Sequence, residues 1–236
     1  MELRRFYVDQ GSIREGIAEV RGEEYRHMTG VLRFRVGFRL ILCDGSGNDY
    51  YCTVTAVDKD KAVCQVDEIH PNESELSYDL TLAMSRIKQE KLEIAVQKTV
   101  EIGVKRIILF ASRYTAEPKV RQDRIERIVK EACKQCGRAV LPQVTLTDNL
   151  EGMIDKAEGK LLVAYEKADL QSRLSALIGQ EDGYTVVIGP EGGFAREEIE
   201  QLAARHAETF SLGARILRAE TAAIVSLGDV VCIRGE

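Results

Sequence analysis

The stretch YTVVIGPEGGFAREEIEQLAARH, residues 184–206, contains an apolar run, a glycine-rich bend and an amphipathic segment in direct succession. β-Branched residues dominate the run before the bend, and Ile199, Leu202 and Ala203 recur at helical spacing after it. This order predicts a strand, a loop and a helix. Ligands of open α/β sheets bind beside the carboxyl ends of strands, so we expect the loop at 189–194 to face a ligand.

The chemistry of this loop narrows the class of ligand. Gly189, Gly192 and Gly193 let the backbone approach a ligand closely, and Pro190 stiffens the bend. The loop contains neither G-x-G-x-x-G nor G-x-x-x-x-G-K-[ST], and Glu191 would repel a pyrophosphate. An ordinary tight turn is the alternative, but the density of these residues favours a binding loop. We therefore expect a neutral or cationic ligand rather than a polyphosphate.

A second glycine-containing loop follows the predicted strand at 208–212. The sequence SLGARILRAETAAIV, residues 211–225, holds Arg215, Arg218 and Glu220 among small and apolar residues. Charged groups so close to a buried run need partners or a chemical role. Glu220 at a helix start also interacts favourably with the helix dipole, so a purely structural ion pair is an equal alternative for that residue.

The pattern along the chain predicts a β domain followed by an α/β domain. Residues 1–70 alternate in polarity around two hairpin-like turns at 44–48 and 58–61, which is typical of a small β-barrel or curled sheet. The polar segment 70–77 is the candidate linker.

Strand and helix patterns alternate after the linker, which predicts a mostly parallel sheet covered on both faces. The expected strands are 79–85, 105–112, 142–146, 160–165, 184–188 and 208–212. The expected helices are 88–103, 122–136, 149–157, 169–178, 195–206 and 219–231, with a further short helix at 23–28 in the β domain.

Composition indicates a globular protein with an uneven charge. The 236 residues are 44% hydrophobic and 30% charged, with a net charge of −5. Residues 1–76 carry −4, residues 77–145 carry +6 and residues 146–236 carry −7. No apolar stretch is long enough to cross a bilayer, which together with the lack of a signal-like start predicts a cytoplasmic protein without membrane contact.

The six cysteines are expected to be reduced. Cys133 and Cys136 lie beside the apolar face at the carboxyl end of the predicted helix 122–136, where the dipole opposes a thiolate. No second pair stands at zinc spacing, so we expect no metal site.

Two long motifs, IGPEGGF at 188–194 and LGARILRAETAA at 212–223, together resemble the 16S ribosomal RNA uridine-N(3) methyltransferases of the SPOUT superfamily. The stretches RHMTGVLRFRVG (26–37), QKTVEIGVKRIILF (97–110) and EACKQCGRAVLPQV (131–144) extend the resemblance over nearly the whole chain. The cysteines at 133 and 136, and Ile102, depart from the usual residues of that family.

The resemblance implies properties that periodicity cannot supply. It implies a PUA-like β-barrel over residues 1–72 that helps to bind RNA, and a methyltransferase domain over 73–236 whose chain forms a trefoil knot. It also implies S-adenosylmethionine as cofactor, a homodimer, and 16S ribosomal RNA of the small ribosomal subunit as substrate, methylated on nitrogen 3 of a specific uridine.

The resemblance assigns the cofactor site to the two motifs and the strand before them. The expected cofactor-binding residues are Ala164, Ile188, Gly189, Pro190, Gly192, Gly193, Leu212, Gly213, Ile216 and Leu217. Arg218 is the hypothesis for the cation that stabilises the uracil anion, with Arg215 as second choice, and Glu220 is a candidate base.

The basic patches supply the expected RNA contacts. Their candidate residues are Arg4, Arg5, Arg26, Arg33, Arg35, Arg86, Lys88 and Lys91. Three other interpretations remain open: a SPOUT methyltransferase acting on another RNA base, a non-catalytic RNA-binding assembly factor, and a nucleotide-phosphate enzyme, against which the absence of a lysine from the loop counts.

Overall fold

The computed structural model describes residues 3–116 and 119–235. The chain divides into two compact units, one formed by Met1–Glu75 with Cys133–Leu141 and the other by Leu76–Ala132 with Pro142–Glu236. The short segment after residue 132 therefore belongs to the unit that contains the amino-terminal part of the chain.

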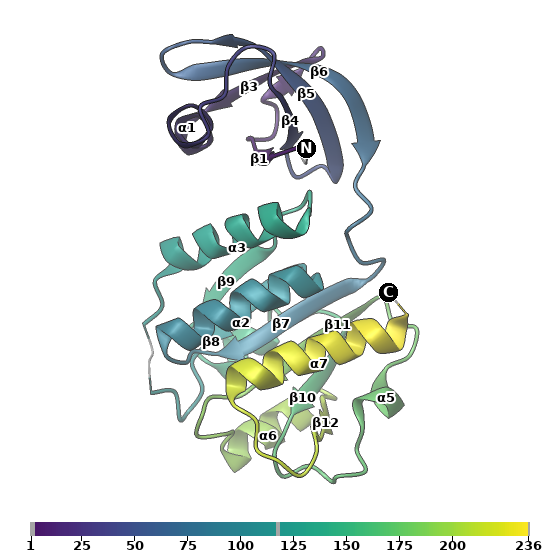
Figure 1. Ribbon diagram of the computed structural model, residues 1–236. Helices are drawn as coiled ribbons and strands as arrows, with labels where there is room; N and C mark the ends of the chain where they lie inside the picture. Colours follow the sequence, from purple (N-terminus) through teal and green to yellow (C-terminus); the bar gives the residue numbers. More distant parts are fainter. Residues whose placement is uncertain (1–2, 117–118, 236) are drawn as a thin grey trace. The chain divides into compact units, whose positions relative to one another are not determined.

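The first unit is a curled six-stranded sheet (Figure 1). Its strands are β1 (Arg5–Tyr7), β2 (Ile13–Arg14), β3 (Ile17–Arg21), β4 (Arg39–Cys43), β5 (Asn48–Val57) and β6 (Lys61–Pro71), in the order β1-β4-β5-β6-β3-β2. The predicted turns at 44–48 and 58–61 join β4 to β5 and β5 to β6, which confirms both hairpins. The expected short helix is α1 (Gly22–Arg26), continued by a single π-helical segment, η1 (His27–Val31).

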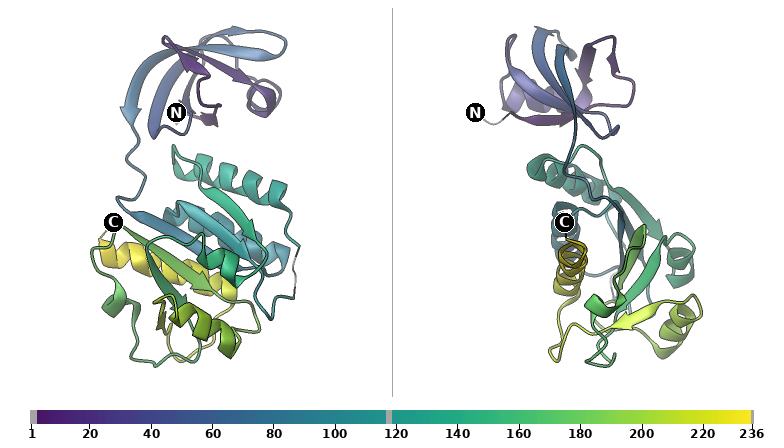
Figure 2. Two further views of the ribbon diagram at one scale, coloured as in Figure 1. Left: turned by 180° about the vertical axis from the view of Figure 1, so that it is seen from behind. Right: turned by 90° about the vertical axis from the view of Figure 1, so that its right-hand side faces the viewer.

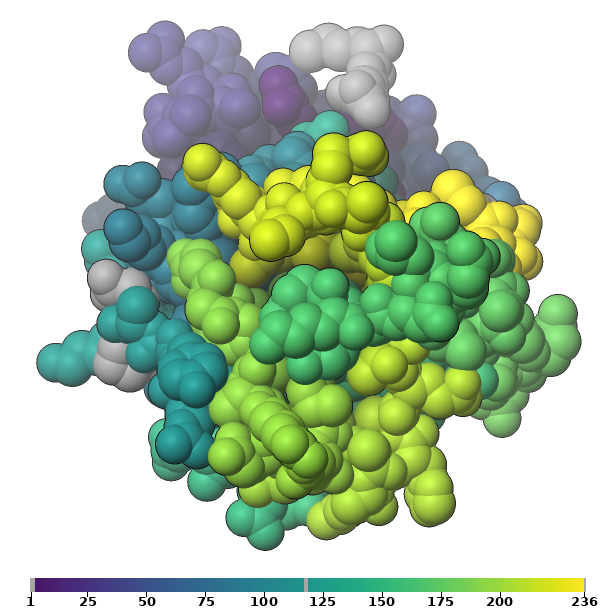
Figure 3. Space-filling model, turned by 90° about the horizontal axis from the view of Figure 1, so that it is seen from below, coloured from purple at the N-terminus to yellow at the C-terminus, as the bar shows by residue number. Residues whose placement is uncertain are grey.

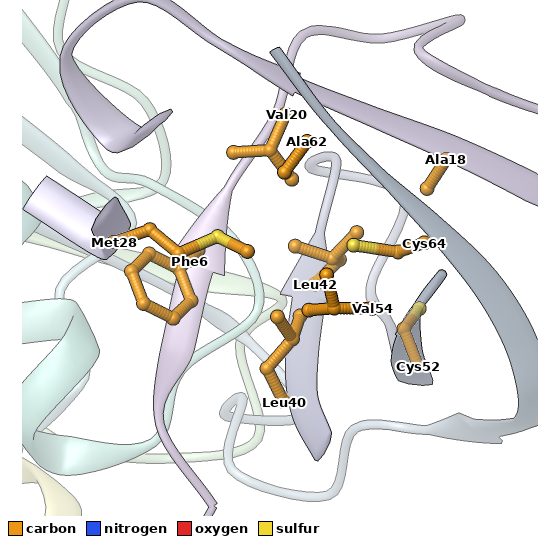
Figure 4. Packing of buried hydrophobic residues seen from close by; sticks show 10 residues of the cluster. All are labelled: Phe6, Ala18, Val20, Met28, Leu40, Leu42, Cys52, Val54, Ala62 and Cys64. Atoms are coloured by element: carbon orange, nitrogen blue, oxygen red, sulfur yellow. The ribbon is translucent and has the colours of Figure 1, made fainter. Parts of the chain in front are cut away.

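Alternation along these strands builds the core of the first unit. Phe6, Val20, Leu42 and Val54 are at most 1% exposed and point into one apolar cluster, with Met28 beside them (Figure 4). Cys52 and Cys64 are buried in the same cluster as small apolar side chains. Burial raises the pKa of the Cys52 thiol to about 12, so this thiol stays protonated at neutral pH.

The second unit has a six-stranded sheet in which every neighbouring pair is parallel, as the sequence predicts. Its strands are β7 (Asp79–Ser85), β8 (Arg106–Phe110), β9 (Gln143–Thr147), β10 (Lys160–Ala164), β11 (Gly183–Ile188) and β12 (Glu208–Phe210), in the order β12-β10-β11-β7-β8-β9. The chain therefore moves outward from β7 through β8 to β9 and then crosses to the other side of β7 for β10. β11 is inserted between β10 and β7, and β12 is added outside β10.

Helices cover both faces of this sheet. They are α2 (Gln89–Ile102), α3 (Gln122–Cys136), α4 (Leu150–Ile154), α5 (Leu174–Leu177), α6 (Arg196–Ala203) and α7 (Ala219–Arg234). α2 and α7 pack together on one face, and α4 and α6 lie on the other (Figures 1 and 2). Val187 and Ala83 face α4 and α6 in a cluster with Met153 and Leu202, so successive strand residues serve opposite faces.

The helix expected near 169–178 is reduced to the four residues of α5. Asp169 turns the chain instead, because its side chain accepts a hydrogen bond from Gln171 N (2.9 Å) and its carbonyl accepts one from Ser172 N (2.8 Å). Local bonding of this kind competes with a helix. An irregular segment consequently follows β10.

The cysteines of α3 have no metal-binding arrangement around them. Burial raises the pKa of the Cys133 thiol to about 12. Across residues 3–116 and 119–235, no group of three His, Cys, Asp or Glu side chains could hold a metal ion. Within that same part of the chain, no helix is long and apolar enough to cross a membrane.

Candidate cofactor site at the carboxyl ends of three strands

Three parallel strands end at the same level of the sheet. Ala164, the last residue of β10, lies opposite Ile188 of β11 and Phe210 of β12. The loops that follow these strands therefore start side by side, although they are separated by up to about 46 residues in the sequence. Open α/β sheets bind their ligands beside the carboxyl ends of their strands.

A cavity of about 580 Å³ opens between these loops. Figure 3 views it from below, with segment 211–218 in yellow, the loop after β11 in lime and the segment after β10 in green around it. It is lined by Ala164, Tyr165, Glu166, Leu170, Ile188, Gly189, Pro190, Glu191, Gly192, Gly193, Phe194, Ser211, Leu212, Gly213, Ala214, Arg215, Ile216, Leu217, Arg218, Ala219 and Ala222. Its volume lies within the range typical of small-molecule and cofactor sites.

The structure brings all ten residues that the sequence suggested for cofactor binding into this one lining. The lining also includes Tyr165, Glu166 and Leu170, which reach the cavity from the irregular segment after β10. The sequence did not indicate these three as binding residues. Leu170 falls in the segment 169–178 that was expected to be helical, whereas Tyr165 was placed in the expected strand 160–165 and Glu166 in no element.

Glycines shape the wall formed by the loop after β11. A Cβ on Gly189 would lie 2.9 Å from the ring of Phe194, so only glycine lets this ring fold under the loop. Gly193 has φ +72°, and its N–H donates to the carbonyl of Pro190 at 2.9 Å, which closes a turn. The bend is thus a fixed part of the wall.

The charges of the lining are balanced. Glu166 and Glu191 contribute carboxylates, Arg215 and Arg218 contribute guanidiniums, and no lysine is part of the lining. The common nucleotide-binding loops use a lysine together with backbone amides to bind phosphate. This cavity lacks such a lysine. Arg218 is exposed and immediately precedes α7, so its side chain starts beside the amino-terminal end of that helix.

Glu220 lies elsewhere. It is buried, does not contribute to the cavity lining, and its carboxylate is 3.6 Å from the ammonium nitrogen of Lys91 on α2. The ion pair with Lys91 ties α7 to α2. Arg218 therefore lines the cavity whereas Glu220 does not, and the ion pair with Lys91 is the interaction that surrounds Glu220.

A buried carboxylate that the sequence did not single out holds the loop in place. Glu198 of α6 is 7% exposed and accepts hydrogen bonds from Ser112 Oγ (2.9 Å) and from the backbone N–H of Arg113 (3.0 Å) and Ala195 (2.9 Å). It joins the start of α6 to the loop after β8. Its side chain is not part of the cavity lining and is bonded to these donors instead.

The candidate RNA-contacting residues fall into two groups. Arg4, Arg26, Arg33 and Arg35 are exposed on the first unit, and Lys88 is exposed at the start of α2 in the second. Lys91 is half-buried and paired with Glu220 as described.

Arg5 and Arg86 differ from the exposed arginines because protein groups already occupy their guanidiniums. Arg5 donates to both carboxylate oxygens of Asp49, one at 2.8 Å, and its side chain is 10% exposed. Burial alone would raise the pKa of Asp49, but the hydrogen bonds from Arg5 outweigh it and hold this pKa below its usual range. Arg86 is 9% exposed and donates to the carbonyl of Thr147 at 2.7 Å. We therefore leave Arg5 and Arg86 out of the RNA surface.

Comparison with known proteins gives consistent matches over both units. The family model of the RNA methyltransferase domain matches residues 74–230, and that of the RNA methyltransferase PUA domain matches residues 20–67. The chain is 31% identical to ribosomal RNA small subunit methyltransferase E of Bacillus subtilis over 89% of this chain and 88% of the relative. It is 28% identical to the protein of the same name from Rickettsia conorii over 98% and 96%.

Solved structures agree in fold and carry a ligand. The chain resembles the ribosomal RNA small subunit methyltransferase E of Neisseria gonorrhoeae bound to S-adenosyl methionine, with a TM-score of 0.86, 25% identity and 98% coverage of both chains. It also resembles a putative methyltransferase of Legionella pneumophila in complex with the cofactor SAM, with a TM-score of 0.81, 26% identity and 98% coverage of both.

Replacing Glu198 with alanine should destabilise the second unit. The substitution leaves a buried hydroxyl and two backbone N–H groups without their acceptor, which we expect to lower the free energy of unfolding by about 3 kcal/mol. Urea unfolding followed by circular dichroism measures this loss.

The neighbouring Glu197 is the matched control. Its side chain is 65% exposed and meets Arg113 only at 3.5 Å, so Glu197→Ala should change the free energy of unfolding by no more than about 0.5 kcal/mol. Equal losses for the two variants would show that Glu198 is not the anchor of this loop.

Proposed function

This chain belongs to the family of RNA methyltransferases that includes ribosomal RNA small subunit methyltransferase E, and we propose that it methylates nitrogen 3 of a specific uridine in 16S ribosomal RNA with S-adenosylmethionine as methyl donor. The observation that carries the proposal is the cavity at the aligned ends of β10, β11 and β12. Relatives that match nearly the full length of the chain carry the same enzyme name.

The residues of the cavity fit this cofactor. S-adenosylmethionine has an adenosine, an amino-acid group and a sulfonium cation but no phosphate, which suits a lining of balanced charge without lysine. Ile188 and Leu217 supply apolar walls, and Gly189 and Gly193 let the backbone come close to the ligand. When bound, the cofactor supplies an electrophilic methyl group.

The task of the chain is to hold the base beside the cavity and to stabilise the charge that develops on it. Nitrogen 3 must give up its proton to a base or to water, so negative charge develops on the uracil ring and is discharged as the methyl group moves from sulfur to nitrogen. Arg218 is the lining guanidinium that we assign to this charge, with Arg215 as second choice. Nitrogen 3 lies on the pairing edge of uracil, so the base must be unpaired or flipped out.

The first unit supports RNA binding. We assign residues 1–72 to an RNA-binding PUA-like β-barrel and residues 73–236 to the methyltransferase domain. The four exposed arginines at 4, 26, 33 and 35 provide phosphate contacts in the otherwise acidic amino-terminal part of the chain.

We extend the proposal to a trefoil knot in the second unit. Ser211 N donates to Ser172 O (2.8 Å) and Ser172 Oγ donates to Thr209 O (2.7 Å). These bonds hold the segment after β12 against the connection between β10 and β11, as a chain that threads through this region requires.

A homodimer and a cytoplasmic location complete the proposal. Ile216 is 88% exposed although it lines the cavity, which supports a second copy of the chain covering this side of the site. The small ribosomal subunit, the proposed partner, is a cytoplasmic particle.

The alternatives to the proposed function are methylation of another RNA base and a non-catalytic RNA-binding assembly factor.

Mass spectrometry of ribosomal RNA tests the function. RNA from a strain that lacks the gene should lose one N(3)-methyluridine from 16S RNA, and the wild-type gene should restore it. Loss of a different modified base would favour the first alternative. An unchanged modification pattern would contradict the enzymatic function.

Arg218→Ala should lower kcat by about 100-fold or more without weakening cofactor binding. The reason is that the guanidinium acts on charge that exists only during the reaction. Steady-state methylation of ribosomal RNA gives kcat, and calorimetric titration gives the Kd of S-adenosylmethionine. Arg215→Ala is the comparison, and an equal or larger loss in that variant would reverse the two assignments.

Removing arginines from the first unit should lower the affinity for RNA and make that affinity less dependent on salt concentration. Each of Arg26→Ala, Arg33→Ala and Arg35→Ala should reduce the slope of log K against log salt by about 1 for each phosphate that the wild-type side chain neutralises. Arg5→Ala is unsuitable here because it breaks the ion pair with Asp49. Filter binding at several salt concentrations measures the slope; no change in any of the three variants would exclude this surface.

A further inference from the structure

An exposed aromatic side chain borders the cavity without lining it. Tyr114 follows β8, is 52% exposed, and packs against the loop after β11 at Gly192. Single exposed aromatic residues are common on proteins, so exposure alone assigns no role. The surroundings of Tyr114 distinguish it.

The backbone on both sides of Tyr114 is fixed. Thr115 Oγ1 accepts a hydrogen bond from Ser112 N (2.8 Å) and lies 2.9 Å from Ser85 Oγ, and Thr115 N donates to Ser112 O (3.0 Å). On the other side, Arg113 N donates to the buried Glu198 (3.0 Å). The loop therefore holds the backbone of an exposed aromatic residue in a set position, which reduces the entropy lost when a partner binds.

Gly192 makes room for this side chain. Its backbone does not have a positive φ, so no turn geometry requires glycine there. A Cβ at this position would lie 3.1 Å from Cβ and 3.7 Å from Cγ of Tyr114. Glycine at 192 thus lets the tyrosine approach the rim of the cavity, and the teal segment after β8 lies beside the lime loop in Figure 3.

A residue on the rim contacts the part of a bound molecule that extends out of the cavity. The cofactor occupies the interior under the proposed function, on which this step rests, so the molecule at the rim is the RNA. An exposed tyrosine ring offers a face on which an unpaired base stacks, as aromatic side chains do in single-stranded RNA sites. The phenol tip adds a hydrogen-bonding group that the stack does not need.

We propose that Tyr114 is a stacking platform for an unpaired nucleotide of the RNA substrate, at the rim of the cofactor cavity beside Gly192. Tyr114 binds and positions the RNA and carries no proton in the reaction. The recognition is by ring face rather than by base edge, so it is tolerant of base identity.

The test compares Tyr114→Ala, Tyr114→Leu and Tyr114→Phe in the full chain. The probe is small-subunit RNA from a strain lacking the gene, with RNA affinity measured by filter binding in the presence of S-adenosylhomocysteine. Steady-state methylation then gives KM for RNA, and calorimetry gives the Kd of S-adenosylmethionine. Thermal unfolding verifies that each variant folds.

The alanine and leucine variants should weaken RNA binding and raise KM by about tenfold, whereas phenylalanine should stay within about twofold of the wild type. The Kd of S-adenosylmethionine should be unchanged in all three. Wild-type affinity in the alanine variant, or a phenylalanine variant as weak as alanine, overturns the stacking role. A wild-type chain that binds RNA but methylates none of it overturns the proposed function instead, and a wild-type chain that binds no RNA overturns both.

Discussion

The register of three parallel strands controls the position of the candidate site. Because Ala164, Ile188 and Phe210 lie side by side, the segments that follow them leave the sheet at one level and enclose one cavity. A shift of β12 by one residue would turn its side chains to the opposite face and move the loop that carries Arg218 away from its neighbours. The position of the cavity thus depends on hydrogen bonding between the backbones of these strands.

Two further interactions hold the loops in place. Glu198 binds the start of α6 to the loop after β8 by hydrogen bonds, and Gly189 lets the ring of Phe194 pack beneath the bend. A loop with several glycines is otherwise flexible, and a binding wall built from it would lose affinity through the entropy of ordering. The same anchor binds the backbone of Arg113, the neighbour of Tyr114, so the wall of the cavity and its outer edge are positioned together.

The sequence was sufficient for those features that arise from local patterns. The alternation of apolar runs and helical spacing predicted the parallel sheet. The family resemblance of the two glycine-containing motifs indicated nine residues that share one cavity lining with Ala164, the tenth expected residue. It failed where side chains act over long distances in sequence. Glu198 bonds to Ser112, 86 residues away in the sequence, and Arg5 pairs with Asp49, 44 residues away. Neither interaction could be recognised from spacing. The turn at Asp169 replaced an expected helix for a local reason that hydrophobic spacing does not express.

Hydrogen–deuterium exchange of the full chain, with and without S-adenosylmethionine, measures most directly whether the two motifs form one site. We expect slower exchange of backbone amides in both 188–194 and 211–219 when the cofactor is present, with little change in the first unit. Slower exchange in only one of these segments, or in neither, would contradict a shared cofactor cavity at the ends of β10, β11 and β12.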